Sequence, residues 1–262
     1  MLVLIKGAGD IASGIALRLF HCGFRIVMTD LEKPTSIRRT VCFSEALANG
    51  TATVEDVTAY IASNPKETFD ITERGYIAVI ADENAECVKA LCPDVVVDAI
   101  LAKRNINTRI DHAPIVIGVG PGFTANVDCH AVIETNRGHS LGRVILSGSA
   151  EPNTGVPGNI GGYTTQRVIR APKAGTFREV ASIGDSVTAN QTVAYVDDVP
   201  VMAQIGGILR GLLPTGTQVH AGMKSGDVDP RCVREHCFLV SDKALSVGGG
   251  VLEAILMLRR KP

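Results

Sequence analysis

The chain has 262 residues, of which 45% are hydrophobic and only 4% aromatic, with 27 glycines and a formal net charge of −1. This length exceeds that of one typical domain, and the aliphatic composition is typical of an α/β protein with buried parallel strands. Because the charge is nearly balanced and no long basic block occurs, we expect no nucleic-acid partner.

The sequence carries no signal of export or membrane insertion. The first apolar run, Leu2–Ile5, is too short for a secretory signal, and no run of about 18 apolar residues occurs elsewhere. The seven cysteines are an odd number, and no two of them have the spacing of a zinc or redox motif. We therefore expect a cytoplasmic protein with reduced thiols, no membrane association and no metal site.

The first segment predicts a strand, a glycine turn and a helix. Leu2–Ile5 is the strand, residues 7–12 (GAGDIA) form the turn, and residues 11–20 carry apolar side chains at helical spacing. The turn matches the pattern G-x-G-x-x-G/A, in which Gly7 makes the sharp bend and Gly9 lets the backbone approach a phosphate. We therefore expect residues Gly7, Gly9, Asp10 and Ile11 to bind the phosphates of a dinucleotide-like ligand.

An acidic residue ends the second predicted strand. Residues 25–29 form that strand, and Asp30 follows Gly9 by 21 residues. A carboxylate there accepts hydrogen bonds from ribose hydroxyls and repels a 2′-phosphate, which favours NAD-like over NADP-like ligands. Arg38 and Arg39, in the following loop, could reach such a phosphate, so binding of an NADP-like ligand stays an alternative. Asp10, inside the turn, has the alternative of capping the helix.

Later segments continue the alternation of strands and helices. Strands are predicted at 77–81, 95–99 and 115–119, with a helix around 83–91. This alternation predicts a Rossmann-like, mostly parallel sheet.

Further candidate ligands follow the later strands. Lys103 and Arg104 come after the strand at 95–99, and Gly120 and Gly122 come after the next. Open α/β sheets bind ligands at the carboxyl ends of their strands, so we expect these residues to share the cofactor site. The alternative is an exposed charge pair and a tight turn.

A short stretch offers three weak catalytic candidates, Glu134, Arg137 and His139. They supply a base, an anion clamp and a titratable imidazole. No spacing rule identifies a reaction, and a structural role for each is the alternative, so the catalytic residues are not assigned.

Residues 171–221 contain an internal repeat with an offset of 32 residues. The pattern A-x3-G-x2-R-x5-G-x2-V-x-A begins at Ala171 and again at Ala203. Each copy is too small to bury a core alone, so the two are expected to pair as a small β-sandwich. The arrangement resembles the barrel-sandwich hybrid of biotinyl and lipoyl carrier domains. The joining hairpin, residues 195–199, contains no lysine, so we expect no covalent arm.

Three segments follow from these patterns. Residues 1–150 form the Rossmann-like domain and residues 163–230 form the two-repeat β-domain, separated by a connector rich in glycine and proline. Residues 231–262 are expected to return to the first domain through a helix with an apolar stripe. Its glycines at 248–250 either allow close packing or present amides to an anion.

Motifs along nearly the whole chain resemble the YqeB family. They are KGAGDIASGIA, VVVDAILAKRN, GPGFTANVD, VIETNRGHSLGRVI, GNIGG, KSGDVDPR and SDKALSVGGGVLEA. The resemblance implies an accessory or cofactor-maturation role in selenium-dependent molybdenum hydroxylase systems, with such a hydroxylase as a partner. The N-terminal part also resembles the Rossmann domain of the XdhC/CoxI accessory proteins.

The leading interpretation is a cytoplasmic maturation factor that binds an NAD-like dinucleotide or a molybdopterin-type cofactor. An NAD-dependent oxidoreductase and a binding module without catalysis are the alternatives. Whether the protein is an enzyme, and whether it forms a homo-oligomer, stay open.

Overall fold

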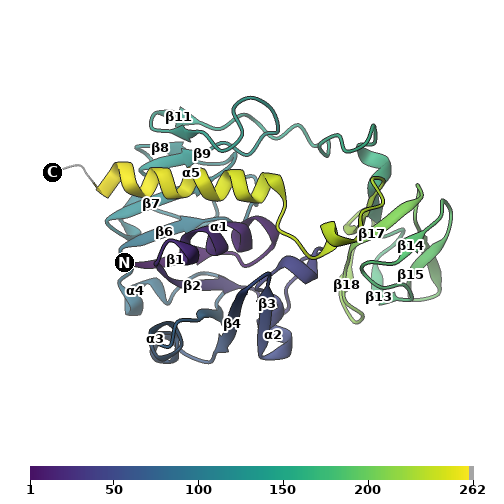
Figure 1. Cartoon of the computed structure of the whole chain (residues 1–262), viewed down its shortest axis with the longest axis horizontal. Helices are drawn as coiled ribbons and strands as arrows, with labels where there is room; N and C mark the ends of the chain where they lie inside the picture. The colour runs from purple at the N-terminus through teal and green to yellow at the C-terminus, as the bar shows by residue number, and fades with distance from the viewer. Residues whose placement is uncertain (260–262) are drawn as a thin grey trace. The chain divides into compact units, whose positions relative to one another are not determined.

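The computed structural model describes residues 1–259, so the last three residues of the predicted segment 231–262 lie outside the described residues. The chain divides into two compact units (Figure 1). Unit 1 contains Met1–Pro34, Cys42–Thr154 and the residues from Val240 onward. Unit 2 contains Thr35–Val41 and Gly155–Leu239.

Unit 1 is a mixed α/β structure built on a nine-stranded sheet with the order β10-β9-β7-β6-β1-β2-β5-β4-β3. The edge pairs β3–β4 and β9–β10 are antiparallel. The other neighbouring pairs are parallel. The strands are β1 (Leu2–Lys6), β2 (Arg25–Asp30), β3 (Thr51–Val54), β4 (Val57–Ala62), β5 (Ile77–Ala81), β6 (Val95–Asp98), β7 (Ile115–Val119), β9 (Ala131–Ile133) and β10 (Val144–Ile145). A separate small pair joins β8 (Thr124–Ala125) and β11 (Gly148–Ser149).

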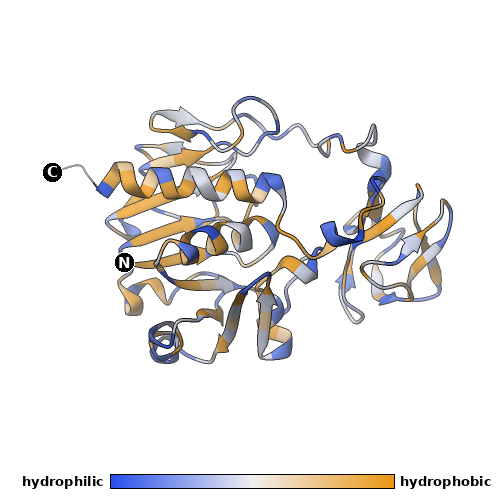
Figure 2. Ribbon diagram, viewed as in Figure 1, coloured by the Kyte–Doolittle hydropathy of each residue, from blue (hydrophilic) through white to orange (hydrophobic). Residues whose placement is uncertain are grey.

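The central strands are apolar except at their carboxyl ends, where β1 ends in Lys6 and β6 ends in Asp98. Every residue of β1, β6 and β7 is buried, and Figure 2 shows these strands as mostly hydrophobic. A run of branched aliphatic residues without alternation is typical of parallel strands that are covered on both faces. Unit 1 also has the helices α1 (Asp10–His21), α2 (Glu45–Asn49), α3 (Pro65–Glu73), α4 (Val88–Leu91) and α5 (Asp242–Arg259).

Helices α1 and α5 pack against each other through small residues, side by side in Figure 1. A Cβ atom added at Gly14 would lie 2.6 Å from Ala244 Cβ, and one at Gly248 would lie 3.0 Å from Gly14 O. The Cβ atom added at Gly248 would also lie 3.2 Å from the Cβ atom of Arg18. Because residues 14 and 18 meet residues 244 and 248, the two helices run in the same direction.

Two of the three glycines of α5 serve packing. Gly248 faces α1, and a Cβ at Gly250 would overlap the carbonyl oxygen of Gly142. Both lie inside the helix, beyond its first turn, so their amides are not available at its N-terminus. The packing interpretation is therefore confirmed for Gly248 and Gly250, whereas a Cβ at Gly249 would meet no atom within 4 Å.

In unit 1, one predicted helix is shorter than expected, and three further elements were not predicted. The helix expected around 83–91 is only the short α4, because Ala85 adopts a left-handed φ of 54° and Asp82 Oδ2 accepts a hydrogen bond from Cys87 N at 2.8 Å. The hairpin of β3 and β4 and the helix α3 are additional elements that the sequence patterns did not predict.

Unit 2 contains two four-stranded sheets, ordered β12-β19-β17-β14 and β16-β15-β13-β18. The two copies of the sequence repeat exchange strands across these sheets. Gly175 pairs with Val219 in one sheet, and Gly207 pairs with Val187 in the other. The strands are β12 (Val168–Arg170), β13 (Gly175–Glu179), β14 (Ser186–Val187), β15 (Thr192–Val196), β16 (Val199–Met202), β17 (Gly207–Leu212), β18 (Gln218–Val219) and β19 (Lys224–Asp229).

The repeated glycines of unit 2 occupy equivalent positions with φ of 155° and 154°. A Cβ at Gly175 would overlap the carboxylate of Asp197, and one at Gly207 would overlap the carbonyl of Asp229. Both glycines are thus required by conformation and by close approach.

Two segments belong to unit 2 although the predicted domain ranges place them elsewhere. Thr35–Val41 lies along β17, where Leu212 N donates to Ile37 O at 2.8 Å and Arg39 Nε donates to Leu212 O at 2.9 Å. Residues 231–239 stay in unit 2, and Arg38 donates to the carbonyls of His236 and Leu239 at 3.0 and 3.1 Å. In the described part of the chain, no helix is long and apolar enough to cross a bilayer.

Candidate functional site

The candidate site lies in unit 1 at the carboxyl ends of β1 and β6. The chain runs from β1 to β2 on one side and later crosses to β6 on the other, so the strand order reverses at β1. Lys6 and Asp98 are register partners at the ends of these two strands. In open α/β sheets such a reversal leaves a crevice in which ligands bind.

The glycine turn follows β1 and is fixed by its surroundings. Gly7 has a φ of 94°, and its N–H donates to Thr29 O at 2.8 Å. A Cβ there would lie 3.0 Å from Ala99 O, so only glycine fits between the turn and the segment after β6. Gly7 therefore contacts both β2 and the segment that follows β6 at this edge of the sheet.

Gly9 and Asp10 begin helix α1. Gly9 is the N-cap residue, with an extended backbone (φ −75°, ψ −172°) that any residue can adopt. Asp10 is the first helical residue, so the alternative that Asp10 caps the helix is wrong; its carboxylate instead lies in the first turn, where the helix dipole favours negative charge. Ile11 is buried in the helix.

Asp30 holds the glycine turn. Its Oδ2 accepts a hydrogen bond from Ala8 N and its Oδ1 accepts one from Leu31 N, both at 2.8 Å. Burial raises the pKa of this carboxyl group. Each carboxylate oxygen has a second lone pair, so acceptor capacity for a hydroxyl remains. Arg38 and Arg39, in contrast, bond within unit 2, where Arg39 also pairs with Glu179 at 2.7 Å.

The loops after β6 and β7 meet, as their positions in the sequence predict. A Cβ at Gly122 would lie 2.6 Å from Arg104 Cα, and one at Gly120 would lie 3.6 Å from Leu101 Cδ2 and 2.7 Å from Thr135 Oγ1. Both glycines have positive φ values, 81° at Gly120 and 111° at Gly122. The Gly120 amide donates to Ile133 O at 2.8 Å and is used within the sheet.

Glu134 organises the next turn of the chain. Its side chain is buried, and its carboxylate accepts hydrogen bonds from the amides of Thr135 and Asn136 at 2.7 Å and of Glu151 at 2.8 Å. Three amide donors thus satisfy the hydrogen-bonding capacity of this buried carboxylate. These three hydrogen bonds give Glu134 a structural role, because they hold the backbone of residues 135, 136 and 151.

The other two weak catalytic candidates lie nearby. Arg137 forms a bidentate pair with Asp242 at 2.7 and 2.9 Å, which ties this stretch to the first turn of α5. His139 is exposed.

The structure adds Lys243, in the first turn of α5, to the predicted Lys103. Burial lowers the pKa of Lys103. Burial also lowers the pKa of Lys243, and the charges of Lys103 and Arg137 lower it further, while Asp10 and Glu134 oppose them. Each of these four charged groups therefore lies close enough to Lys243 to influence its pKa. Lys243 lies within the motif SDKALSVGGGVLEA, but the sequence analysis did not assign it to the site, because only the packing of α5 on α1 brings it there.

A buried polar cluster beneath the turn was also missed by sequence. The Lys6 side chain is only 1% exposed. Its Nζ bonds to Thr108 Oγ1 at 2.6 Å, to Asn107 Oδ1 and, at 3.3 Å, to Asp98 Oδ2. Burial lowers the pKa of Lys6, and Asp98 opposes that effect. The available signal was a lysine at the end of an otherwise apolar strand, directly before the glycine turn.

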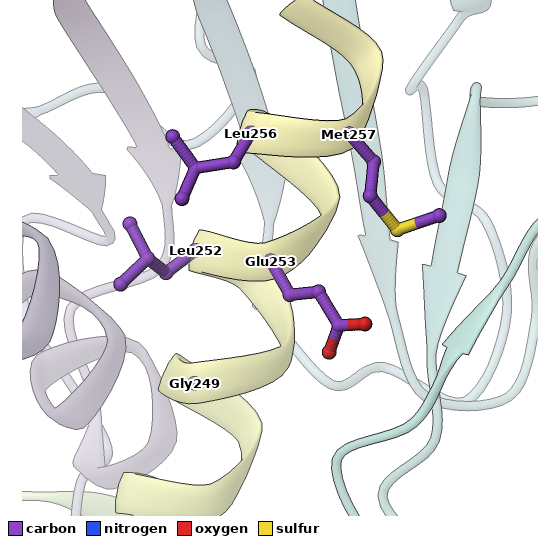
Figure 3. Close-up of a pocket in the computed structure, with 5 residues that line it drawn as sticks. All are labelled: Gly249, Leu252, Glu253, Leu256 and Met257. Atoms are coloured by element: carbon purple, nitrogen blue, oxygen red, sulfur yellow. The ribbon is translucent and has the colours of Figure 1, made fainter. Parts of the chain in front are cut away.

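A separate groove of about 380 Å³ lies on α5 (Figure 3). It is lined by Gly249, Leu252, Glu253, Leu256 and Met257. This lining is apolar except for one carboxylate, so the groove offers no cation to an anionic ligand. Within residues 1–259, no group of three His, Cys, Asp or Glu side chains is arranged to hold a metal ion. The seven cysteines are unpaired, with Cys22, Cys92 and Cys232 exposed and the others buried.

Comparisons with known proteins give one strong sequence match. No family model matches the chain. Among solved structures, a succinylglutamate desuccinylase/aspartoacylase from Rhodobacter sphaeroides is 21% identical, with a TM-score of 0.22 over 24% of this chain and 21% of that one. An aspartoacylase family protein from Mesorhizobium loti is 12% identical, with a TM-score of 0.27 over 87% of this chain and 84% of that one.

The curated relative is a protein of Escherichia coli (strain K12) named "Uncharacterized protein YqeB". It is 54% identical over 257 residues, which are 98% of this chain and 48% of the relative. The chain thus spans about half the length of that protein. The match supports, by name, the YqeB resemblance that the sequence motifs indicate.

Proposed function

We propose that unit 1 is a Rossmann-type domain that binds an NAD-like dinucleotide or a molybdopterin-type cofactor. The observation that carries this proposal is the position of the Gly7–Ile11 turn, which opens α1 at the point where the strand order reverses. The N-terminus of α1 then faces the ligand phosphates, and Asp30 stands beside the turn with acceptor capacity for a ribose hydroxyl.

The resemblance to the YqeB family supports the biological role within this proposal. The protein acts in the cytoplasm as an accessory or maturation factor for selenium-dependent molybdenum hydroxylases, with the hydroxylase as its partner. The 54% identity to the YqeB relative over nearly the whole chain is the support for this step.

Unit 2 is proposed to be a barrel-sandwich-hybrid-like domain without a covalent arm. Its hairpin between β15 and β16 carries Asp197 and Asp198, where carrier domains have a lysine. Lys173 pairs with both carboxylates, at 3.1 and 3.3 Å. In this proposal the unit meets a partner protein.

A binding module without catalysis is the second candidate, and the bonds of Glu134 and Arg137 favour it over an oxidoreductase. Glu134 already accepts three amide hydrogen bonds, and Arg137 is held by Asp242. Groups engaged in this way are poorly placed to exchange protons with a substrate.

The test is the substitution Gly9→Val, because the backbone at Gly9 suits any residue whereas the side chain would block a phosphate. We expect calorimetry with NAD and ADP to show at least about tenfold weaker binding than in the unaltered protein, a loss of about 1.4 kcal/mol. Circular dichroism should show a normal fold.

The same variant tests the maturation role. In cells that make a selenium-dependent molybdenum hydroxylase, replacing this protein by Gly9→Val should lower hydroxylase activity at unchanged hydroxylase abundance. Equal nucleotide affinity in the folded variant would remove the glycine turn from the binding site. Loss of affinity with normal hydroxylase activity would instead leave a binding module of different purpose.

A further inference from the structure

We infer that the outer face of α5 is a docking surface for a helix of a second protein domain, the counterpart of the half of the YqeB relative that this chain does not match. The outer face consists of the residues that line the groove, namely Gly249, Leu252, Glu253, Leu256 and Met257. The inference goes beyond the proposed function, because none of these residues is proposed to bind the cofactor.

Helix α5 is apolar around its circumference, although only one side of it is covered. Between residues 244 and 258, Glu253 is the only charged residue. The side that includes Val251 is buried in unit 1, whereas Leu256 and Met257 are 41% and 40% exposed. A surface helix normally carries polar residues on its solvent side, and a helix that is apolar all round is normally buried. The sequence of the outer face therefore matches a covered surface.

The groove on this face has a form that a second helix fits. Figure 3 shows Leu252 and Leu256 on one side of the groove and Glu253 and Met257 on the other. The members of each pair are four residues apart, so the two pairs form neighbouring ridges of the helix. Helices in globular proteins most often pack by inserting such a ridge of one helix into such a groove of another. The shape of the surface thus favours a helix as its occupant.

Gly249 leaves one end of the groove open. A Cβ atom added there would meet no atom within 4 Å, so packing within unit 1 does not require a glycine at this position. Glycine inside a helix is destabilising relative to alanine, whereas it allows another backbone to approach closely. A helix that crosses α5 at Gly249 would use this close approach.

The relative indicates which protein supplies this helix. The match covers 98% of this chain and 48% of the relative, so about half of that protein has no counterpart among the 262 residues. Two parts of one polypeptide stay at high effective concentration and commonly meet through an interface with apolar residues. The outer face of α5 offers such an interface on the matched part. The occupying helix is expected to carry apolar residues four apart and a Lys or Arg that reaches Glu253.

Cysteine labelling compares this chain with the full-length relative. Leu256→Cys in this chain should react rapidly with a maleimide, because the position is exposed. We expect a cysteine at the equivalent position of the full-length relative to react at least about tenfold more slowly, because a helix covers it. Lys66→Cys, at an exposed position of α3, is the control and should react at the same rate in both proteins. Mass spectrometry of the labelled peptides separates these sites from the native cysteines.

The substitution Gly249→Leu tests the groove itself. Its side chain has free space in this chain, so the melting temperature of this chain should not fall. In the full-length relative, the same leucine at the equivalent position should obstruct the docked helix and restore rapid labelling at the position of Leu256. Lys66→Leu, which adds the same side chain to α3, should not restore it.

Every other outcome overturns the inference. Equal labelling of Leu256→Cys and its equivalent would show that no second domain covers α5, and equal slowing at Lys66 would show general protection in the larger protein. Slow labelling that the leucine does not relieve would show a cover outside the groove. If ultracentrifugation shows a dimer of this chain that Gly249→Leu dissociates, the occupant is a second copy. The ADP affinity of Gly9→Val decides the proposed function separately, because none of these measurements uses a nucleotide.

Discussion

The ion pair of Lys6 and Asp98 is stable in the interior only because its polar atoms have partners. Lys6 Nζ reaches three oxygen atoms, and Thr108 Oγ1 donates to Asp98 Oδ2 at 2.6 Å. Ile100 N donates to the other carboxylate oxygen at 3.2 Å. Removing one member of such a buried pair leaves an uncompensated charge.

We therefore expect Asp98→Ala to lower the free energy of unfolding of unit 1 by about 3–5 kcal/mol, measured by urea denaturation. Adding Lys6→Met should recover much of that loss, because the unpaired ammonium group is then gone. Asp111→Ala is the control, since Asp111 pairs with Arg109 at the exposed surface and should change stability little. Equal effects of the Asp98 and Asp111 substitutions would contradict a buried pair that depends on both charges.

At the residue scale, the sequence predicted those site residues whose position depends on residues close to them in the chain. Gly7 and Asp30 follow from the turn pattern, and the structure shows them bonded to each other's segments. Lys243 and the partners of Lys6 depend on contacts between distant segments, which spacing does not encode. The structural bonds of Glu134 were likewise hidden, because its donors are backbone amides.

Helix α5 shows how three identical residues can have three different environments. A Cβ at Gly248 would meet α1, one at Gly250 would overlap Gly142 O, and one at Gly249 would meet no atom within 4 Å. The cost of a side chain is therefore set by direction around the helix.

We expect Gly249→Ala to raise the free energy of unfolding by about 0.5–1 kcal/mol, because alanine loses less backbone entropy in a helix and nothing blocks its methyl group. Gly250→Ala should lower it by about 1–3 kcal/mol, because the methyl group overpacks the contact with Gly142. Thermal unfolding of the two variants, which differ only in the position of one methyl group, measures both. The same sign of change in both variants would contradict the packing of α5.

At the element scale, long apolar runs were predictable and irregular turns were not. The strands at 77–81 and 115–119 agree with β5 and β7 to the residue, since buried parallel strands need a continuous apolar run. The hairpin of β3 and β4 turns through Glu55, whose φ is 54°. Glutamate is not a typical residue for a left-handed turn, so no glycine or asparagine marked it.

Each unit as a whole has its own core, and unit 2 also buries charge. Arg210 and Arg167 pair with Asp227, while Arg210 and Arg231 pair with Asp229. Burial alone would raise the pKa of the Asp229 carboxyl, but the Arg231 hydrogen bonds and the charges of Arg210 and Arg231 lower this pKa to about 2.

The stability of unit 2 should consequently fall in acid. Because the folded pKa of Asp229 lies below the unfolded value of about 3.9, its contribution of about 2 kcal/mol is complete above pH 4 and is lost as the pH falls toward 2. Calorimetric unfolding between pH 5 and 2.5 should show this loss, and Asp229→Asn should weaken the pH dependence. Asp198→Asn, at an exposed site of the same unit, should leave it unchanged. An identical acid slope in all three proteins would contradict the assignment to Asp229.

At the scale of the molecule, the alternation of strands and helices predicted the sheet of unit 1, because its core segments follow one another along the chain. The place of Thr35–Val41 was not predictable, since its bonds to Leu212 join segments far apart in sequence. The 32-residue repeat predicted two paired β-units in unit 2, because similar sequences tend to adopt similar structures.

The exchange of strands between the two repeats of unit 2 bears on how such a unit could arise. Strand β13 pairs with β18 of the second copy, and β17 pairs with β14 of the first. A shorter ancestral chain with one copy would have left both edges open, and two such chains would have closed them by associating about a two-fold axis. Duplication of the gene, followed by fusion, would turn that homodimer into a single chain. Each half could then diverge, so that Arg178 stacks on Tyr195 in one copy while Arg210 pairs with Asp227 in the other.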